Sequence, residues 1–366
     1  MAAARVLVVI GTRPEAIKLA PVVRALAAAP WADVRVVATA QHRELLDPVL
    51  RFFEVGVDHD LDAMRTDQPI AELASRMVTS LDRVIADERP AVMVAQGDTT
   101  TTLVAALAAF WRRVPFAHVE AGLRTGDLAR PFPEEGHRRM VAQVTALHFA
   151  PTESAKQNLL REGTAAANVH VVGNTVVDAV QWVAPRVDAS RFAPPAGKRL
   201  VFVTMHRRES FGEPLANVCS ALRRIADRGD VDLLVAVHPN PSVRDVVRGA
   251  LGDHAAIRLA APLDYPDAIA AMRASSLILT DSGGIQEEAP SLGKPVLVLR
   301  DVTERREAVD AGAALLVGTA TERIVAAADR LLDDAVAYAA MAVARFPFGS
   351  GNSAAAIVRI LENGIS

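Results

Sequence analysis

Carboxylates gather near the ends of successive predicted strands in the amino-terminal half of the chain. Asp98 follows a strand predicted over residues 91–95. Glu120 follows the strand predicted over residues 116–119, and Glu134 precedes a predicted helix. Because the carboxyl ends of parallel strands share one edge of a sheet, we expect the three carboxylates to lie together. Mutual repulsion and burial would raise the pKa of at least one of them, which suits proton transfer. Each alone is more often a helix cap or an ion-pair partner, whereas three at successive strand ends favour a catalytic site.

A second segment with binding chemistry reads LILTDSGGIQEEAPSL over residues 277–292. An apolar strand pattern leads directly into Ser282, Gly283 and Gly284 and then into a predicted helix. Two glycines let the backbone turn without a Cβ clash, so amide N–H groups at the helix start can converge on an anion. The glutamate pair that follows can accept hydrogen bonds from sugar hydroxyls. The segment therefore predicts a nucleotide or sugar-phosphate site, and an ordinary strand-to-helix turn is an equally good interpretation of it taken alone.

Cations and a histidine occupy three further loops that follow predicted strands. Arg13 and Lys18 follow the first strand and would suit a diphosphate, although surface cations on a plain turn are the alternative. His206 follows a strand predicted over residues 200–204 and could contact a phosphate or a leaving oxygen, or be an ordinary loop histidine. Arg305 could reach the glycine loop, and a surface salt bridge is the default for a loop arginine. No GxGxxG or Walker pattern accompanies these residues, which argues against a nicotinamide dinucleotide or ATP.

Composition narrows the class of protein. The chain has 366 residues, of which 51% are hydrophobic and 4% aromatic, as in an α/β protein of about two domains. A formal net charge of −3 without basic runs argues against nucleic acid as a partner, and no apolar stretch is long enough to cross a membrane. The short apolar N-terminus predicts no signal peptide, and we expect a cytoplasmic protein. The single cysteine, Cys219, excludes an internal disulfide, and no His/Cys spacing indicates a metal.

Apolar runs alternate with helical patterns twice along the chain, which is typical of doubly wound parallel sheets. In the first half, strands are predicted over residues 5–10, 34–39, 91–95, 116–119, 147–150 and 169–172, and helices over 16–29, 41–53, 70–86 and 101–111. In the second half, strands are predicted over 200–204, 233–237, 257–259, 277–280, 296–299 and 315–316. We therefore predict an α/β fold of two Rossmann-like domains. The first covers residues 1–175 and is completed by a terminal helix over 352–366, and the second covers 176–351.

Long motifs spread over nearly the whole chain carry a family resemblance. They read GTRPEAIKLAP, TAQHRELLD, GDTTTT, HVEAGLRTGD, PEE, GNTVVDA, HRRESFG and TDSGGIQEEAPSLGKPVLVLRD. These motifs resemble those of the non-hydrolysing UDP-N-acetylglucosamine 2-epimerases. The resemblance implies the two-domain glycosyltransferase-B fold with substrate in an interdomain cleft, a homodimer, and no cofactor. It also implies reversible epimerisation of UDP-N-acetylglucosamine to UDP-N-acetylmannosamine, in cell-surface polysaccharide biosynthesis.

The same resemblance implies a mechanism and a set of site residues. UDP would be eliminated to leave 2-acetamidoglucal and would then add back after protonation on the opposite face of carbon 2. The matching catalytic positions are Asp98, Glu120, Glu134 and His206. The matching substrate-binding positions are Arg13, Lys18, Asp98, Glu120, His206, Ser282, Gly283, Gly284, Glu288 and Arg305. Which carboxylate is the acid and which the base stays open.

Some positions depart from the family pattern. Ala268 stands where members commonly place a phenylalanine against uracil, so Tyr265 or backbone groups could contact the base instead. His137 stands where asparagine is usual, and Arg306 where proline is usual. These changes leave an epimerase of a related nucleotide sugar as an alternative. A glycosyltransferase of the same fold and a non-catalytic nucleotide-sugar sensor are further alternatives, because fold alone does not fix chemistry.

Many bacterial members of the family bind a second UDP-N-acetylglucosamine as an activator, and the resemblance implies candidate residues for that site. They are Gln41, Glu44, Arg207 and His238. Glu44 stands where activated members often have glutamine, and Asp67 where some have arginine. Allosteric activation is therefore open from the sequence.

Overall fold

The apolar runs of the amino-terminal half pair into one parallel sheet of seven strands, in the order β3-β2-β1-β4-β5-β6-β7. The computed structural model describes residues 3–39, 43–65, 67–205 and 212–365, and it places this sheet in a unit made of Met1–Ala179 and Phe348–Ser366. The strands are β1 (Ala4–Ile10), β2 (Ala32–Ala38), β3 (His59–Asp60), β4 (Val92–Gln96), β5 (Phe116–Val119), β6 (Leu147–Ala150) and β7 (Val169–Val171). Residues 6–10 of β1 are fully buried, as expected for a parallel strand covered on both faces.

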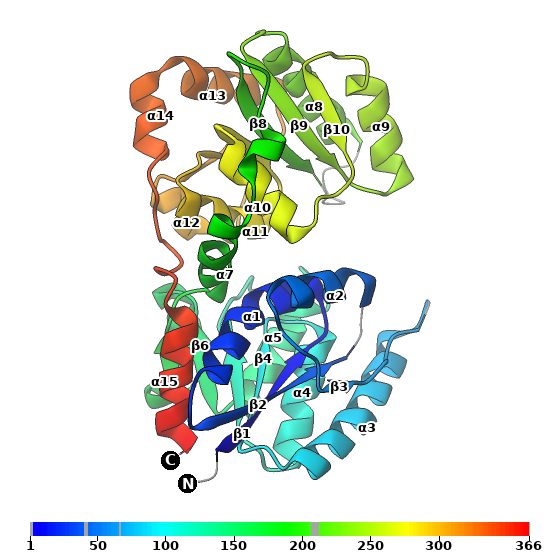
Figure 1. The fold of residues 1–366 in the computed structure, drawn as a ribbon, viewed down its shortest axis with the longest axis vertical. Helices are drawn as coiled ribbons and strands as arrows, with labels where there is room; N and C mark the ends of the chain where they lie inside the picture. Colours follow the sequence, from blue (N-terminus) through cyan, green and yellow to red (C-terminus); the bar gives the residue numbers. More distant parts are fainter. Residues whose placement is uncertain (1–2, 40–42, 66, 206–211, 366) are drawn as a thin grey trace. The chain divides into compact units, whose positions relative to one another are not determined.

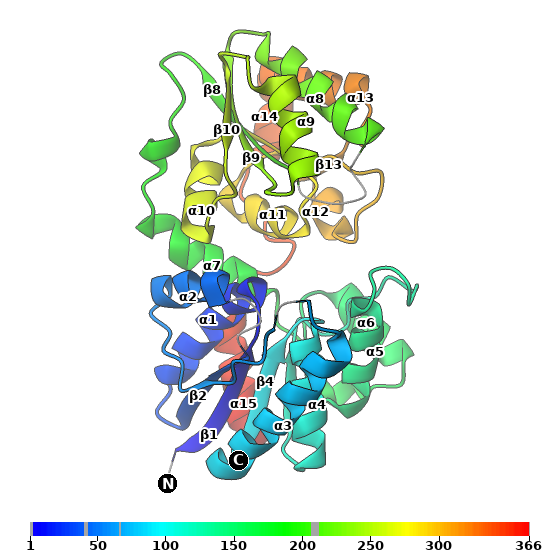
Figure 2. The ribbon, with the colours of Figure 1, turned by 90° about the vertical axis from the view of Figure 1, so that its right-hand side faces the viewer.

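Helices cover both faces of this first sheet. They are α1 (Arg13–Ala27), α2 (Arg43–Phe52), α3 (Ile70–Glu88), α4 (Thr100–Trp111), α5 (Glu134–Val144) and α6 (Glu153–Arg161), together with the C-terminal α15 (Ser353–Ile365). Helix α7 (Thr175–Val183) follows β7 and contains the boundary between the two units. Helix α15 packs against α1 on one face, whereas α4 packs between α3 and α5 on the other (Figures 1 and 2). Asp178 of α7 accepts hydrogen bonds from the amides of Ser353 and Ala354, at 3.3 and 2.9 Å, and so caps the start of α15.

The second unit, Val180–Pro347, contains a parallel sheet of six strands in the order β10-β9-β8-β11-β12-β13. Its strands are β8 (Arg199–Met205), β9 (Val231–Val237), β10 (Ile257–Ala260), β11 (Leu277–Thr280), β12 (Val296–Val298) and β13 (Ala314–Leu316). Its α-helices are α8 (Glu213–Ala226), α9 (Pro241–Leu251), α10 (Tyr265–Ala274), α11 (Gly283–Glu288), α12 (Arg306–Asp310), α13 (Thr321–Asp333) and α14 (Ala335–Met341). The predicted fold class, two doubly wound parallel sheets, is confirmed.

Both sheets reverse their strand order at one place, and this fixes where loops can form a site. In the first sheet β1 neighbours β4, and in the second β8 neighbours β11, although other strands lie between them in the sequence. Ligands of doubly wound proteins bind beside the carboxyl ends of strands at such a switch point. Seven of the eleven predicted catalytic and substrate-binding residues follow these strands, in the loop or in the helix that comes next: Arg13 and Lys18 after β1, Asp98 after β4, and Ser282, Gly283, Gly284 and Glu288 after β11. No described helix is long and apolar enough to cross a membrane.

Candidate functional site

The turn after β1 is tied to the turn after β4 by one buried carboxyl group. Glu15 accepts hydrogen bonds from the amides of Gly11 and Thr12, at 2.5 and 2.9 Å, and from the hydroxyl of Thr99. Burial raises the pKa of Glu15 to about 7, and these hydrogen bonds oppose the rise. Glu15 is not among the site residues predicted from the sequence. The signal was present, because Thr12 and Glu15 have the spacing of a capping box at the start of α1.

Glu120 follows β5 with a left-handed backbone and is held by donors from three other segments. Its φ is 63°, a conformation that costs a non-glycine residue energy and is kept only where contacts over-determine it. Lys18 of α1 lies 2.6 Å from its Oε1, and the Asn174 amide lies 3.2 Å from the same atom. The Gln96 side chain donates to Oε2. The predicted residues Lys18 and Glu120 are therefore brought together as a partly buried ion pair.

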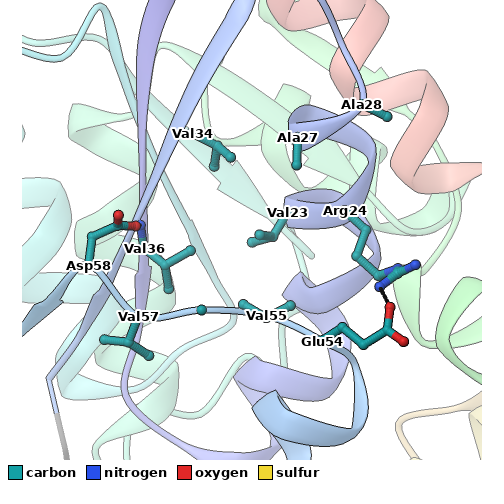
Figure 3. Close-up of a pocket in the computed structure, with 11 residues that line it drawn as sticks. Val23, Arg24, Ala27, Ala28, Val34, Val36, Glu54, Val55, Val57 and Asp58 are labelled. Atoms are coloured by element: carbon teal, nitrogen blue, oxygen red, sulfur yellow. Dashed lines mark hydrogen bonds and ion pairs between the residues drawn. The ribbon is translucent and has the colours of Figure 1, made fainter.

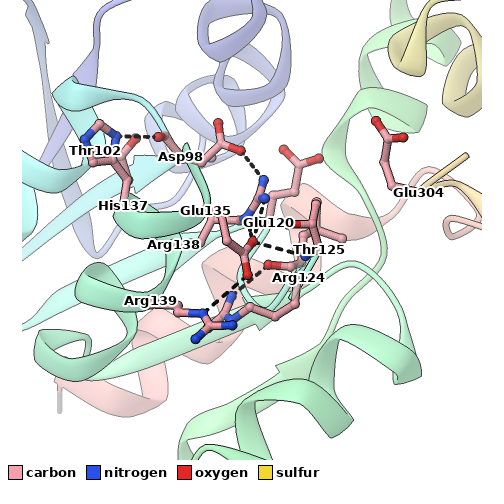
Figure 4. Close-up of polar contacts among 12 residues, drawn as sticks. Asp98, Thr102, Glu120, Arg124, Thr125, Glu135, His137, Arg138, Arg139 and Glu304 are labelled. Carbon is pink, nitrogen blue, oxygen red and sulfur yellow. Dashed lines mark hydrogen bonds and ion pairs between the residues drawn. The ribbon is translucent and has the colours of Figure 1, made fainter. Parts of the chain in front are cut away.

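Asp98 follows β4 and is held by helix α5, as Figure 4 shows. The Arg138 guanidinium donates to Asp98 Oδ2 at 2.7 Å and to Glu135 Oε2 at 2.7 Å. Glu135 is fully buried and also accepts from the amide of Thr125 at 3.1 Å. Burial alone would raise the pKa of Glu135, but the hydrogen bonds from Arg138 and the amides hold it below its usual value. Glu135 was not singled out from the sequence, which gives no sign of which glutamate in PFPEE faces inward.

Glu134 is the first residue of α5, one helical turn before Arg138. Its Oε2 atom is buried and has no hydrogen-bond partner among the described residues. Because residues four apart lie on one face of a helix, Glu134 shares a face with the arginine that holds Asp98. Glu134 thus belongs to helix α5, and Asp98 is bound to the same helix through Arg138. Arg13 is the first residue of α1, which follows the neighbouring strand β1.

Two buried histidines belong to neighbouring strands of the first sheet. His118 of β5 and His148 of β6 are partners in the sheet register, and both are buried. Burial lowers the pKa of His118 to about 4 and, together with the charge of neighbouring groups, that of His148 to about 3. Both rings are therefore neutral at physiological pH. His118 Nε2 lies 2.7 Å from the carbonyl oxygen of Gly97, directly before Asp98.

In the second unit, β11 leads through Ser282 into α11, whose first residues are Gly283 and Gly284. The prediction that these glycines are needed for the turn is wrong, because both begin the helix and neither has a positive φ. A Cβ on Gly283 would lie 3.4 Å from Arg305 Cζ, an ordinary van der Waals distance, so the arginine side chain lies directly beside this glycine. Arg305 Nε donates to Glu287 Oε1 at 2.8 Å. Ser282, Gly283 and Arg305 therefore meet at the carboxyl end of β11.

Other predicted residues are placed as follows. Glu288 ends α11 and is buried. Burial raises the pKa of Tyr265 in α10 well above its usual value, and the charge of Glu288 adds to this rise. His238 lies between β9 and α9, where its Nδ1 accepts from the Asn240 amide at 3.1 Å. Glu44 belongs to α2, Ala268 to α10 and Arg306 to α12. Gln41, His206 and Arg207 lie outside the described residues.

A cavity of about 470 Å³ lies elsewhere in the first unit. Figure 3 shows that it is lined by apolar side chains of α1 and β2 and by the segment 54–58, with an ion pair of 2.7 Å between Arg24 and Glu54. None of the predicted site residues lines it. The described residues also contain no group of three His, Cys, Asp or Glu side chains placed to hold a metal ion.

Comparisons of sequence and of structure all match this chain to the same protein family. A family model described as UDP-N-acetylglucosamine 2-epimerase matches residues 24–362. A UDP-N-acetylglucosamine 2-epimerase of Yersinia pestis is 50% identical, with 98% of each chain covered. The crystal structure of the Neisseria meningitidis UDP-GlcNAc 2-epimerase bound to UDP-GlcNAc is 41% identical with a TM-score of 0.91, covering 98% of this chain and 100% of that one. The Methanocaldococcus jannaschii enzyme, in complex with UDP-GlcNAc and UDP, is 33% identical with a TM-score of 0.83, with 98% and 100% covered.

Proposed function

Because the chain belongs to the UDP-N-acetylglucosamine 2-epimerase family, we propose that it interconverts UDP-N-acetylglucosamine and UDP-N-acetylmannosamine by eliminating and re-adding UDP. The enzyme is an isomerase of glycosyltransferase-B type fold. The observation that carries the proposal is the near full-length match, joined to three carboxylates that follow β4 and β5 and begin α5. In the proposed reaction the proton leaves carbon 2 as the UDP oxygen leaves carbon 1, which gives 2-acetamidoglucal.

Contacts in the first unit support different roles for its carboxylates. Glu120 accepts from Lys18, Asn174 and Gln96, so three donors fix the place of its carboxyl group, and its proposed role is to orient Lys18. Asp98 uses Oδ2 for Arg138, and Glu134 has a buried oxygen without a partner among the described residues. We propose Asp98 and Glu134 as the proton-transfer pair, because epimerisation needs one group on each face of the sugar.

Contacts in the second unit support UDP binding there. Arg305 lies beside Gly283 at the end of β11, where its guanidinium could donate to a diphosphate. The carboxylate of Glu288 would accept from ribose hydroxyls, and Ser282 would contact a phosphate. His206, which follows β8 in the sequence, is proposed to stabilise the departing UDP oxygen. The solved relatives whose descriptions include UDP-GlcNAc or UDP support a UDP-sugar as the ligand.

Proton NMR of the purified protein with UDP-N-acetylglucosamine in deuterated water tests the proposal. We expect UDP-N-acetylmannosamine to form and both sugars to gain deuterium at carbon 2. Product without deuterium would refute proton abstraction. Release of UDP only when an acceptor is added, with no epimer, would favour a glycosyltransferase, and binding without turnover a sensor. A panel of other UDP-sugars identifies which sugar is the substrate, because His137 and Arg306 could change the sugar that is accepted.

Further proposals rest on family membership. We propose a homodimer that acts in the cytoplasm and supplies a cell-surface polysaccharide, and light scattering after size exclusion measures the dimer. We also propose that a second UDP-N-acetylglucosamine activates the enzyme through Gln41, Glu44, Arg207 and His238. The initial rate with UDP-N-acetylmannosamine alone should then rise when a trace of UDP-N-acetylglucosamine is added. A rate independent of that addition would refute activation.

A further inference from the structure

The turn that presents Asp98 has its main-chain carbonyl groups held one after another by side chains. The Gln96 oxygen accepts from the Thr102 hydroxyl at 2.7 Å, and the Gly97 oxygen lies 2.7 Å from His118 Nε2. The Asp98 oxygen lies 2.9 Å from His137 Nδ1. A carbonyl oxygen can only accept, so in both rings the contacting nitrogen carries a proton. His137 therefore has its proton on Nδ1, and Figure 4 shows its ring directed at Asp98.

These three donors belong to different elements, and His137 is the one that connects the turn to helix α5. Thr102 belongs to α4, which starts within the same segment, and His118 belongs to the adjacent strand β5. His137 belongs to α5, which begins at Glu134. His137 is 5% exposed as a residue, so its side of the hydrogen bond to Asp98 is buried.

Two side chains of helix α5 therefore bind Asp98. His137 binds its main chain at 2.9 Å, and Arg138 binds its carboxylate at 2.7 Å. Glu134, His137 and Arg138 are spaced i, i+3 and i+4, so they share one face of the helix. Because a helix is stiff over one turn of about 5 Å, the two contacts fix Asp98 relative to Glu134.

We propose that His137 is a positioning residue that sets the placement of Asp98 relative to Glu134, a role that rests on the epimerase function proposed above. Proton transfer on the two faces of carbon 2 requires both carboxylates at fixed places. A misplacement of about 1 Å in such a group can lower a rate by about 100-fold. The ring touches neither UDP nor sugar in this role, so losing its hydrogen bond should change kcat far more than KM.

The matched variants are His137→Asn and His137→Leu. Asparagine places a donating nitrogen the same number of bonds from Cβ as His137 Nδ1, whereas leucine places a methyl group there. We expect His137→Leu to lower kcat by on the order of tenfold or more, with KM within about threefold, and His137→Asn to restore most of kcat. The control is His254→Leu, which removes a histidine that contacts Asp227 at 3.0 Å in the second unit and should leave both constants unchanged.

Steady-state kinetics, unfolding temperatures and long-range proton–nitrogen NMR of the imidazole rings are measured on the full chain. The NMR spectrum should show the His137 ring protonated on Nδ1, and a ring protonated only on Nε2 would contradict the contact. Wild-type kcat in His137→Leu would overturn the inference, as would equal losses in the Asn and Leu variants with lowered unfolding temperatures. Failure of the proposed function is distinguishable, because the wild-type protein would then form no epimer.

Discussion

Glu15 is predicted to make the stability of the first unit depend on pH near neutrality. Its carboxyl group is buried, and burial raises its pKa from the ordinary 4.5 to about 7. Between these values the folded protein keeps the proton that the unfolded chain has lost. Stability from this group is therefore fully present below about pH 4.5 and is lost as the pH rises through about 7.

The substitution Glu15→Gln removes this titration while keeping the neutral form's shape. A glutamine can accept from the amides of Gly11 and Thr12 through its oxygen and donate to the Thr99 hydroxyl through its nitrogen. At about 1.4 kcal/mol per tenfold change in proton affinity, the interval from 4.5 to about 7 corresponds to roughly 3 kcal/mol. Between about pH 5 and about pH 8 the wild type should lose roughly 2.5 kcal/mol of this unfolding free energy, and the variant should not.

Urea unfolding followed by tryptophan fluorescence measures this difference. Trp31 and Trp111 lie in the first unit, and Trp182→Phe in both proteins removes the tryptophan of the second. The unfolding free energy of the wild type minus that of Glu15→Gln should fall as the pH rises. Glu153→Gln, at an exposed position of the same unit, is the control. A difference that stays constant within about 0.5 kcal/mol, or that rises with pH, would refute the argument.

Further predictions concern the glycine, amide and thiol groups of the two units. Gly11→Ala should destabilise the first unit by about 3 kcal/mol, measured by urea unfolding, because the new Cβ would overlap the Thr101 hydroxyl and lie 2.6 Å from that of Thr39; an unchanged midpoint would contradict this. Asn174→Ala should lower kcat by about tenfold in the epimerase assay, because Glu120 loses a donor, and an unaltered kcat would show that this contact does not matter. Cys219 is buried with its pKa raised to about 11, so a thiol reagent should modify it only after unfolding, and rapid labelling of the native protein would refute its burial.

The elements with strong local patterns were predictable from the sequence. The strands over 116–119, 147–150 and 277–280 have the bounds expected from their apolar runs, because a strand buried on both faces is mostly apolar. The strand β3 was missed, since its two residues are too few to form a pattern. Helix α1 starts three residues before its predicted first residue, at Arg13, because Pro14 fits the first turn of a helix.

The amino-acid pattern was enough to predict which residues follow strand ends, and so which of them stand at the edge where a doubly wound sheet binds its ligand. The roles of Asp98, Glu120 and Glu134 stay predictions. The pairings of Lys18 with Glu120 and of Glu15 with Thr99, across 102 and 84 residues, could be seen only in the folded protein. The physical reason is that periodicity and capping act over a few residues, whereas these contacts depend on which strands become neighbours and which side chains are buried between them.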